Sequence, residues 1–164
     1  MTRRVVAAVA VATSVLLGCG SDVEKAPDSI GLDRALETAE PAGAPFDGLT
    51  AVDVTVGGDP LRVVVADEAV ERSAGLRDRT DPEPYDGMLF VPDRETTTSF
   101  TMRGVDEPLD LAFFDADGER LGGHEMTPCA EGVVCPSYRS EVAWRFALET
   151  PAGGMPDGEL RARS

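Results

Sequence analysis

The chain has few of the residues from which catalytic and metal sites are most often built. It includes one histidine, His124, and three cysteines, Cys19, Cys129 and Cys135. The cysteines form no Cys-x-x-Cys motif, which excludes a thioredoxin-like redox pair. Cys129 and Cys135 are also too far apart in sequence for the usual zinc knuckle, and one histidine cannot complete the ligand set. We therefore expect neither a metal site nor a cofactor.

Positive charge is scarce as well. The sequence has 15 Lys and Arg residues against 30 Asp and Glu, a formal net charge of −15 at pH 7. Loss of Arg3 and Arg4 with an N-terminal leader would bring the charge to about −17. Such a surface repels nucleic acid phosphates and anionic lipid headgroups. We expect a monomer that binds no nucleic acid and meets a membrane only through an anchor.

Long hydrophobic runs are missing beyond the N-terminus. Two arginines precede an apolar run, Val5 to Leu17, that is broken only by Thr13 and Ser14. This run is too short to span a bilayer and is typical of a secretory signal, which we assign to residues 1–18.

The end of the leader carries the sequence Leu-Leu-Gly-Cys, which closes on Cys19. It resembles the lipobox of bacterial lipoproteins, in which the cysteine is acylated and becomes the new N-terminus. An ordinary signal peptide with a chance cysteine is the alternative. Because two or more acyl chains hold a protein stably on a membrane, we expect an extracytoplasmic protein with a lipid anchor to the cell membrane.

Residues 19–47 combine the acylated cysteine with a segment rich in Gly, Pro, Ser and acidic residues. This composition is typical of a disordered tether. The stretch 29–40 has apolar residues spaced for a turn or two of helix, but a short helix with no partner is marginal. We expect disorder here and a single globular domain over residues 48–164.

The domain shows the two-residue alternation of β-strands. A Gly-Gly-Asp-Pro sequence at 57–60 indicates a hairpin turn. Residues 67–79 are typical of a short helix, with Asp67 as N-cap and Gly75 as C-cap. The expected strands are 49–56, 61–66, 87–91, 97–102, 109–115, 119–126, 142–149 and 158–163. About seven to eight short strands with one helix predict a mainly β sandwich or barrel.

Two acidic residues interrupt apolar strands. In the 109–115 strand both faces are apolar except at Asp110, because alternate residues face opposite sides. In the 142–149 strand, Glu149 ends a similar run. A buried carboxylate needs a partner or a raised pKa, so Asp110 is expected to be partly buried and to have a partner.

These carboxylates are the candidate catalytic residues: Asp110 with Glu125 or Glu149, acting as acid and base. Arg79 and Arg72, at the predicted helix, are candidate partners for Asp110 or Glu149. The same residues fit a polar cluster that binds a ligand. The alternative that we favour is a structural salt bridge with turn hydrogen bonds, which looks the same in sequence.

The stretch 124–138 holds the histidine and two cysteines. We do not expect His124 and Cys129 to form a nucleophile pair, because a Thr-Pro turn separates them. Outside the cytoplasm, Cys129 and Cys135 are expected to form a disulfide, which leaves Cys19 for lipid. Closing this loop contributes about 2.4 kcal/mol on the chain-entropy model.

Five ordered blocks resemble a widespread prokaryotic family catalogued as domain of unknown function 192. The blocks are VADEAVERSAGLRDR, GMLFV, SFTMRGVDEPLDLAFFDADGE, EMTPC…CPSY and FALETPAGG. They extend over about residues 50 to 160. The resemblance implies a compact, jelly-roll-like domain with one helix, often secreted or lipid-anchored, and it implies no activity.

The chain departs from the family pattern at three places. Thr101 stands where a Trp is usual, Arg77 where a Met is usual, and Arg103-Gly104-Val105 replaces Lys-Asn-Thr. If the Trp and Met line a pocket in relatives, the pocket is altered or lost here. The candidate ligand-binding residues are Arg72, Arg79, Met88, Thr101, Met102, Asp110 and Glu149.

Two classes of function remain. The favoured one is a lipid-anchored binding or accessory module of the cell envelope, which recognises an envelope ligand or protein. The alternative is an extracytoplasmic hydrolase with paired carboxylates. The binding module is favoured because the sequence contains no Ser-His, Cys-His or metal constellation.

Overall fold

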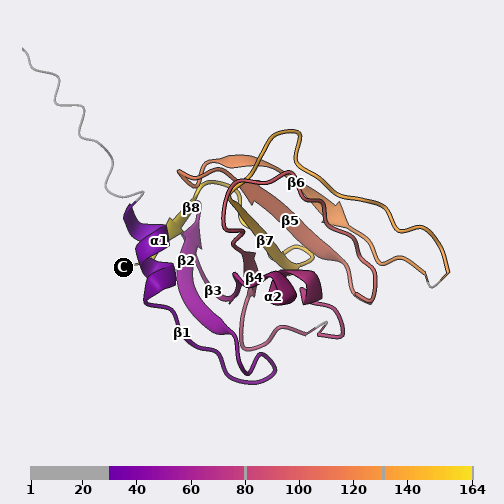
Figure 1. The fold of residues 1–164 in the computed structure, drawn as a ribbon, viewed down its shortest axis with the longest axis horizontal. Coiled ribbons are helices and arrows are strands. Elements are labelled where there is room, and N and C mark those ends of the chain that lie inside the picture. The colour runs from indigo at the N-terminus through magenta and orange to yellow at the C-terminus, as the bar shows by residue number, and fades with distance from the viewer. Residues whose placement is uncertain (1–29, 80, 131, 164) are drawn as a thin grey trace, which may run out of the picture.

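The computed structural model describes residues 30–79, 81–130 and 132–163, and this part of the chain contains eight strands and two helices (Figure 1). The elements are α1 (Ile30–Glu37), β1 (Glu40–Pro41), β2 (Thr50–Val56), β3 (Asp59–Ala66), α2 (Ala69–Ala74), β4 (Gly87–Phe90), β5 (Leu109–Phe114), β6 (Arg120–Met126), β7 (Phe146–Pro151) and β8 (Leu160–Ala162). None of the described helices is long and apolar enough to span a membrane.

The strands form one sheet that curls into a half-barrel. The strand order is β1-β2-β3-β4-β7-β5-β6. The strand β8 also pairs with β2, along the same edge of β2 as β1. The β3–β4 pair is parallel and is connected through α2, whereas the other pairs are antiparallel. The prediction of a mainly β fold is confirmed.

The β2–β3 hairpin follows directly from its turn residues. Val56 pairs with Asp59, which leaves Gly57 and Gly58 as the two loop residues. Their φ angles are +59° and +96°. Positive φ at both loop positions is typical of the type I′ turn of two-residue hairpins, and glycine adopts it without strain.

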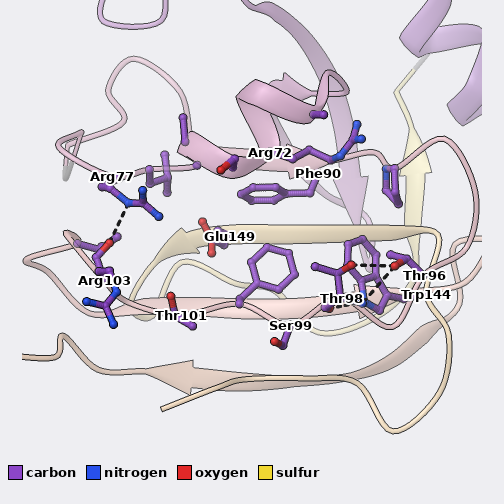
Figure 2. Close-up of a pocket in the computed structure, with 18 of the residues that line it drawn as sticks. Arg72, Arg77, Phe90, Thr96, Thr98, Ser99, Thr101, Arg103, Trp144 and Glu149 are labelled. Atoms are coloured by element: carbon purple, nitrogen blue, oxygen red, sulfur yellow. Dashed lines mark hydrogen bonds between the residues drawn. The ribbon is translucent and has the colours of Figure 1, made fainter. Parts of the chain in front are cut away.

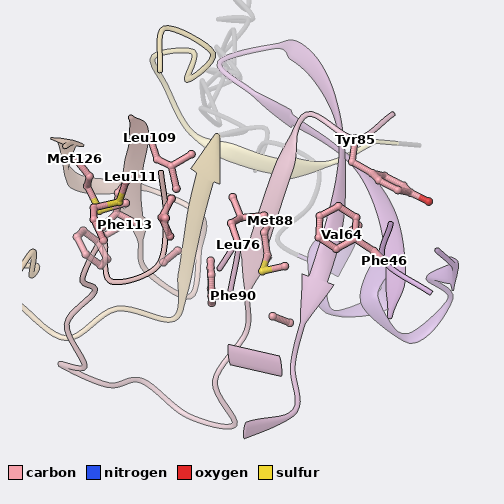
Figure 3. Close-up of a cluster of buried hydrophobic side chains, with 14 of the residues drawn as sticks. Phe46, Val64, Leu76, Tyr85, Met88, Phe90, Leu109, Leu111, Phe113 and Met126 are labelled. Atoms are coloured by element: carbon pink, nitrogen blue, oxygen red, sulfur yellow. The ribbon is translucent and has the colours of Figure 1, made fainter. Parts of the chain in front are cut away.

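Each face of the sheet buries its own apolar cluster. One cluster includes Met88, Leu111 and Phe113 and is covered by Leu76 from the end of α2 (Figure 3). The other lies on the opposite face and includes Ala112 and Phe114 of β5. Successive β5 residues thus alternate between the two clusters, as the expected strand periodicity requires.

The N-terminal part of the domain differs from expectation. Residues 30–47 are ordered, so the prediction of a disordered tether up to residue 47 is wrong there; residues 1–29 lie outside the described residues. Leu32 of α1 is buried on the second cluster, and α1 lies beside β8 (Figure 1). Phe46 is fully buried in the first cluster. The physical reason is that α1 has a partner, an apolar strand from the other end of the chain.

Three further predictions need correction. The segment 97–102 is not a strand; in the described chain it makes one isolated bridge, from Phe100 to Tyr138, and Tyr138 lies outside the named strands. The strand expected at 142–149 begins only at Phe146. The second helix begins after Glu68 rather than after Asp67, because Glu68 is its N-cap.

Candidate functional site

A cavity of about 800 Å³ lies between α2 and the loop that follows β4 (Figure 2). This loop, residues 92–105, forms one wall, and α2 with the residues after it forms the other. Phe90 of β4, Trp144 and Glu149 of β7 form the floor. The volume is that of a typical small-molecule site.

The α2 wall is held in place by short-range polar contacts. The carboxylate of Glu71 accepts hydrogen bonds from the backbone N–H groups of Asp67 and Glu68, at 3.2 and 3.0 Å. Nη1 of Arg72 donates to the carbonyl oxygens of Asp67 and Val91, which ties α2 to the end of β4. Gly75, with φ +55°, ends the helix directly above the floor.

The loop wall is pinned to the segment before β7. Thr96 and Trp144 exchange two backbone hydrogen bonds of 3.0 and 2.9 Å. The indole Nε1 of Trp144 also donates to the carbonyl of Thr98, at 3.1 Å. Phe100 exchanges a second pair of backbone bonds with Tyr138. These contacts set the cavity wall before any ligand arrives.

Three aromatic side chains give the cavity an apolar surface. The ring centroids of Phe90 and Phe100 are 4.9 Å apart in an edge-on arrangement. Those of Phe100 and Trp144 are 5.6 Å apart. Phe90 and Trp144 are each only 2% exposed, so the half-buried Phe100 contributes most of the aromatic surface that a ligand can reach.

Glu149 is the one described charged residue that is buried by solvent exposure. It pairs with Met88 of β4 and Leu111 of β5, both buried, so its side chain points to the same face as theirs. Figure 2 shows its carboxyl group in the space between the α2 wall and the loop wall. Only 5% of the residue is exposed.

Burial raises the pKa of Glu149 to about 8, and desolvation is the whole cause. No described residue compensates it with an ion pair or a hydrogen bond. At pH 7 the carboxyl group is therefore mostly protonated, and it can donate one hydrogen bond into the cavity.

Arginines dominate the charged groups around the cavity. Within the described chain, Arg72, Arg77, Arg94 and Arg103 line it, against Asp93 and Glu149. Nε of Arg77 donates to the carbonyl of Arg103 at 3.0 Å (Figure 2). This bond fixes the guanidinium plane of Arg77 and leaves its terminal nitrogens unused by other described residues.

The structure divides the candidate ligand-binding residues. Arg72 and Thr101 line the cavity together with Glu149, so a cavity is present although Thr101 replaces the usual Trp. Met88 and Met102 are buried in the apolar core beneath it. Arg79 lies outside, with its guanidinium 5.1 Å from the centre of the Phe46 ring.

Asp110 and Glu149 cannot act as a pair, because they lie on opposite faces of the sheet. In the β5–β7 register Asp110 faces Thr150, whereas Glu149 faces Leu111. Asp110 is half-buried and accepts a hydrogen bond of 2.7 Å from the backbone N–H of Gly153. The expected turn hydrogen bond is confirmed.

The salt bridges expected at Asp110 and Glu149 are not found among the described residues. Among the described residues, neither Arg72 nor Arg79 forms an ion pair with Asp110 or Glu149. The arginines bind backbone carbonyls and an aromatic ring instead, which satisfies them without a carboxylate. Glu125 is the cross-strand partner of Asp110 and is exposed, away from the cavity.

The 124–138 stretch contributes a loop and no cavity residue. Cys129 and Cys135 are at disulfide-bonding distance, with Cα atoms 5.5 Å apart. Nε2 of His124, on the edge strand β6, lies 2.8 Å from the carbonyl oxygen of Arg139. Over the described ranges, no group of three His, Cys, Asp or Glu side chains is placed to hold a metal ion.

Sequence reasoning missed most of the cavity. Phe90, Phe100 and Trp144 come from separate segments, and no spacing in the sequence links them. The usable signals were Glu149, an acidic residue in an otherwise apolar strand, and the departures from the family pattern at Arg77 and Thr101, which both line the cavity.

The comparisons with known proteins agree with the fold. The profile of the family DUF192, described as "Uncharacterized ACR", matches residues 52–162. A crystal structure of a protein of unknown function from Novosphingobium aromaticivorans DSM 12444 is 26% identical, with a TM-score of 0.62, over 77% of this chain and 95% of that one.

A putative transcription regulator from Sinorhizobium meliloti 1021 is 25% identical, with a TM-score of 0.58, over 68% of this chain and 92% of that one. No curated protein matches the chain. The similar structures thus support the fold and assign no ligand.

Proposed function

The chain belongs to the DUF192 family, and we propose that it is a lipid-anchored, extracytoplasmic module that binds a small molecule in the cavity beside α2. The single observation that carries this proposal is the buried carboxyl group of Glu149, which faces the cavity without a partner. Burying such a group destabilises the fold unless something compensates it. A purely structural strand would place an apolar residue there.

The rest of the cavity has the features of a binding site. Its floor is apolar and aromatic, and a few polar groups converge on it, the combination typical of small-molecule sites. Both walls are fixed by hydrogen bonds, at Arg72 on one side and at Trp144 on the other. A preformed cavity lowers the entropic cost of binding.

A hydrolase with paired carboxylates has less support. Glu149 is the only one of the three candidate carboxylic acids at the cavity, and Asp110 lies on the other face of the sheet. Carboxyl pairs that hydrolyse glycosides need about 5–9.5 Å between them on one open site.

The proposed location rests on the leader sequence and the cysteines. Cys19 ends a lipobox-like sequence in the part of the chain outside the described residues. Cys129 and Cys135, at bonding distance, fit an oxidising compartment. The anchor would hold the module on the outer side of the cell membrane.

The binding proposal is tested by a compound screen read through Trp144, the only tryptophan of the chain and part of the cavity floor. A bound compound should change its emission saturably and raise the melting temperature. The variant Ala74→Phe places a ring on the cavity wall and should weaken binding at least about tenfold.

Val70→Phe is the matched control on the same helix, because Val70 is 76% exposed and lies outside the cavity lining. It should bind as the wild type does. Equal binding by wild type and Ala74→Phe would show that the ligand sits elsewhere.

A further inference from the structure

We propose that the ligand of this cavity is a small organic anion with an apolar body, which places a hydrogen-bond acceptor at Glu149. This inference rests on the proposed function and adds to it the chemical class of the ligand. Three independent features of the cavity support it: its charge, the state of its buried acid and its aromatic floor.

The charge of the cavity is opposite to that of the molecule. The whole chain carries a net charge of −15, but the cavity lining has four arginines against Asp93 and Glu149. A local positive field in an acidic protein attracts anions to this site. A cationic ligand would instead meet repulsion from the arginines.

Arg77 is the best-placed anchor for the anionic group. Its Nε is occupied by the carbonyl of Arg103, so the guanidinium is already oriented. Its terminal nitrogens remain available, and in Figure 2 the guanidinium points toward the interior of the cavity. An oriented guanidinium binds a planar or tetrahedral anion with two hydrogen bonds.

Arg72 is less available. Its Nη1 is held by the carbonyl oxygens of Asp67 and Val91, which makes it mainly a tether of α2. Arg94 and Arg103 are exposed at the rim and add to the positive field.

Glu149 reinforces the choice of an anion. With its pKa raised to about 8 by burial, the carboxyl group is neutral at pH 7 and offers a donor rather than a negative charge. An anion in the cavity favours this neutral form further, because a second negative charge nearby is repelled. Anion binding and protonation of Glu149 therefore support each other.

The aromatic residues of the lining favour a ligand with an apolar part. Phe90 and Trp144 are almost fully buried, and Phe100, which packs edge-on against Phe90, is half-buried. An apolar group of the ligand can cover this surface, whereas a compact ion such as phosphate would leave it exposed to water.

The coupling to protonation can be assigned because few charged groups surround Glu149. The other charged residues of the lining are Arg72 on α2, Arg77 just after it, and three residues of the loop wall, Asp93, Arg94 and Arg103. Its strand neighbours Met88 and Leu111 are apolar. Arginine stays protonated up to about pH 12, so a loss of anion binding near pH 8 to 9 belongs to Glu149.

The test compares two dyes that share one ring system, anilinonaphthalene sulfonate and neutral phenylnaphthylamine. The protein is the full chain with Cys19→Ser, which cannot be acylated. Energy transfer from Trp144 reports bound dye, and loss of the signal in Ala74→Phe shows that the dye lies in the cavity. We expect the sulfonate to bind at least about tenfold more tightly than the neutral dye, and Arg77→Gln to remove most of that preference.

Arg139→Gln is the matched arginine control, because Arg139 is exposed and outside the lining; it should keep the preference. Between about pH 7 and pH 10 the sulfonate should lose at least about tenfold in affinity, and Glu149→Gln should abolish this loss. Neither dye changes charge in this range.

The outcomes separate the two proposals. Binding of the neutral dye as tight as that of the sulfonate, or tighter binding of the flat cationic dye thioflavin T, would overturn the anionic class and leave a binding cavity. A failure of all three dyes to bind at Trp144 would overturn both the anionic ligand class and the proposed binding function. A preference for the sulfonate that survives in Arg77→Gln would contradict the anchor.

Discussion

Glu149 makes the folded chain less stable than a neutral side chain at its position would. The folded state holds the proton of this carboxyl group up to about pH 8, whereas an unfolded glutamate releases it near its ordinary value of 4.5. Between these two pH values the folded state binds more protons than the unfolded state. The contribution of Glu149 to the free energy of unfolding therefore falls as the pH rises, and it is fully lost above about pH 8.

Replacement of Glu149 by Gln should therefore stabilise the chain at neutral and alkaline pH. The gain should be absent near about pH 4.5 and grow to a few kcal/mol by about pH 8, at roughly 1.4 kcal/mol per pH unit. Thermal or urea unfolding at a series of pH values measures it. Glu125→Gln, the same change at an exposed site on β6, should stay within about 0.5 kcal/mol of the wild type. Parallel stability curves for Glu149→Gln and wild type would refute the buried, unpaired carboxyl.

At the scale of helices and strands, local patterns predicted the elements whose neighbours are close in sequence. The β2–β3 hairpin, β5 and β6 follow from alternation and turn residues alone. The alternation in 97–102 did not produce a strand because its described partner is a single residue outside the named strands, Tyr138, which bridges to Phe100.

Elements that depend on distant partners were not predictable in this way. The first helix is stable because Leu32 packs on a cluster that includes Leu160, from the other end of the chain. The cavity is a second case, since its walls and floor come from four separate segments. The alternation of residues along the strand marked Glu149 as unusual, but only its register with Met88 and Leu111 shows which face of the sheet it occupies.

For the whole molecule, the early start of the folded domain limits its distance from the proposed anchor. The chain from Cys19 to the start of α1 at Ile30 spans at most about 40 Å when fully extended. A lipid on Cys19 would therefore keep the cavity close to the membrane, in spite of the repulsion between the acidic surface and anionic headgroups.

Cys19→Ser should release the protein from the membrane fraction, because residue 19 could no longer be acylated and none of the described helices could span a membrane. Fractionation of cells, followed by detection of the protein in membrane and supernatant, measures this. Cys135→Ser changes another cysteine and should leave the protein in the membrane fraction. Membrane association of Cys19→Ser equal to that of the wild type would contradict the lipid anchor.

The binding proposal depends on a carboxyl group in the cavity that is neutral at pH 7. The most direct measurement is a pH titration of the glutamate side-chain carboxyl ¹³C signals by NMR, with Glu149→Gln to assign the resonance. We expect one signal that titrates near pH 8 in the wild type and is missing from the variant. A Glu149 signal that titrates near its ordinary value of 4.5 would contradict it.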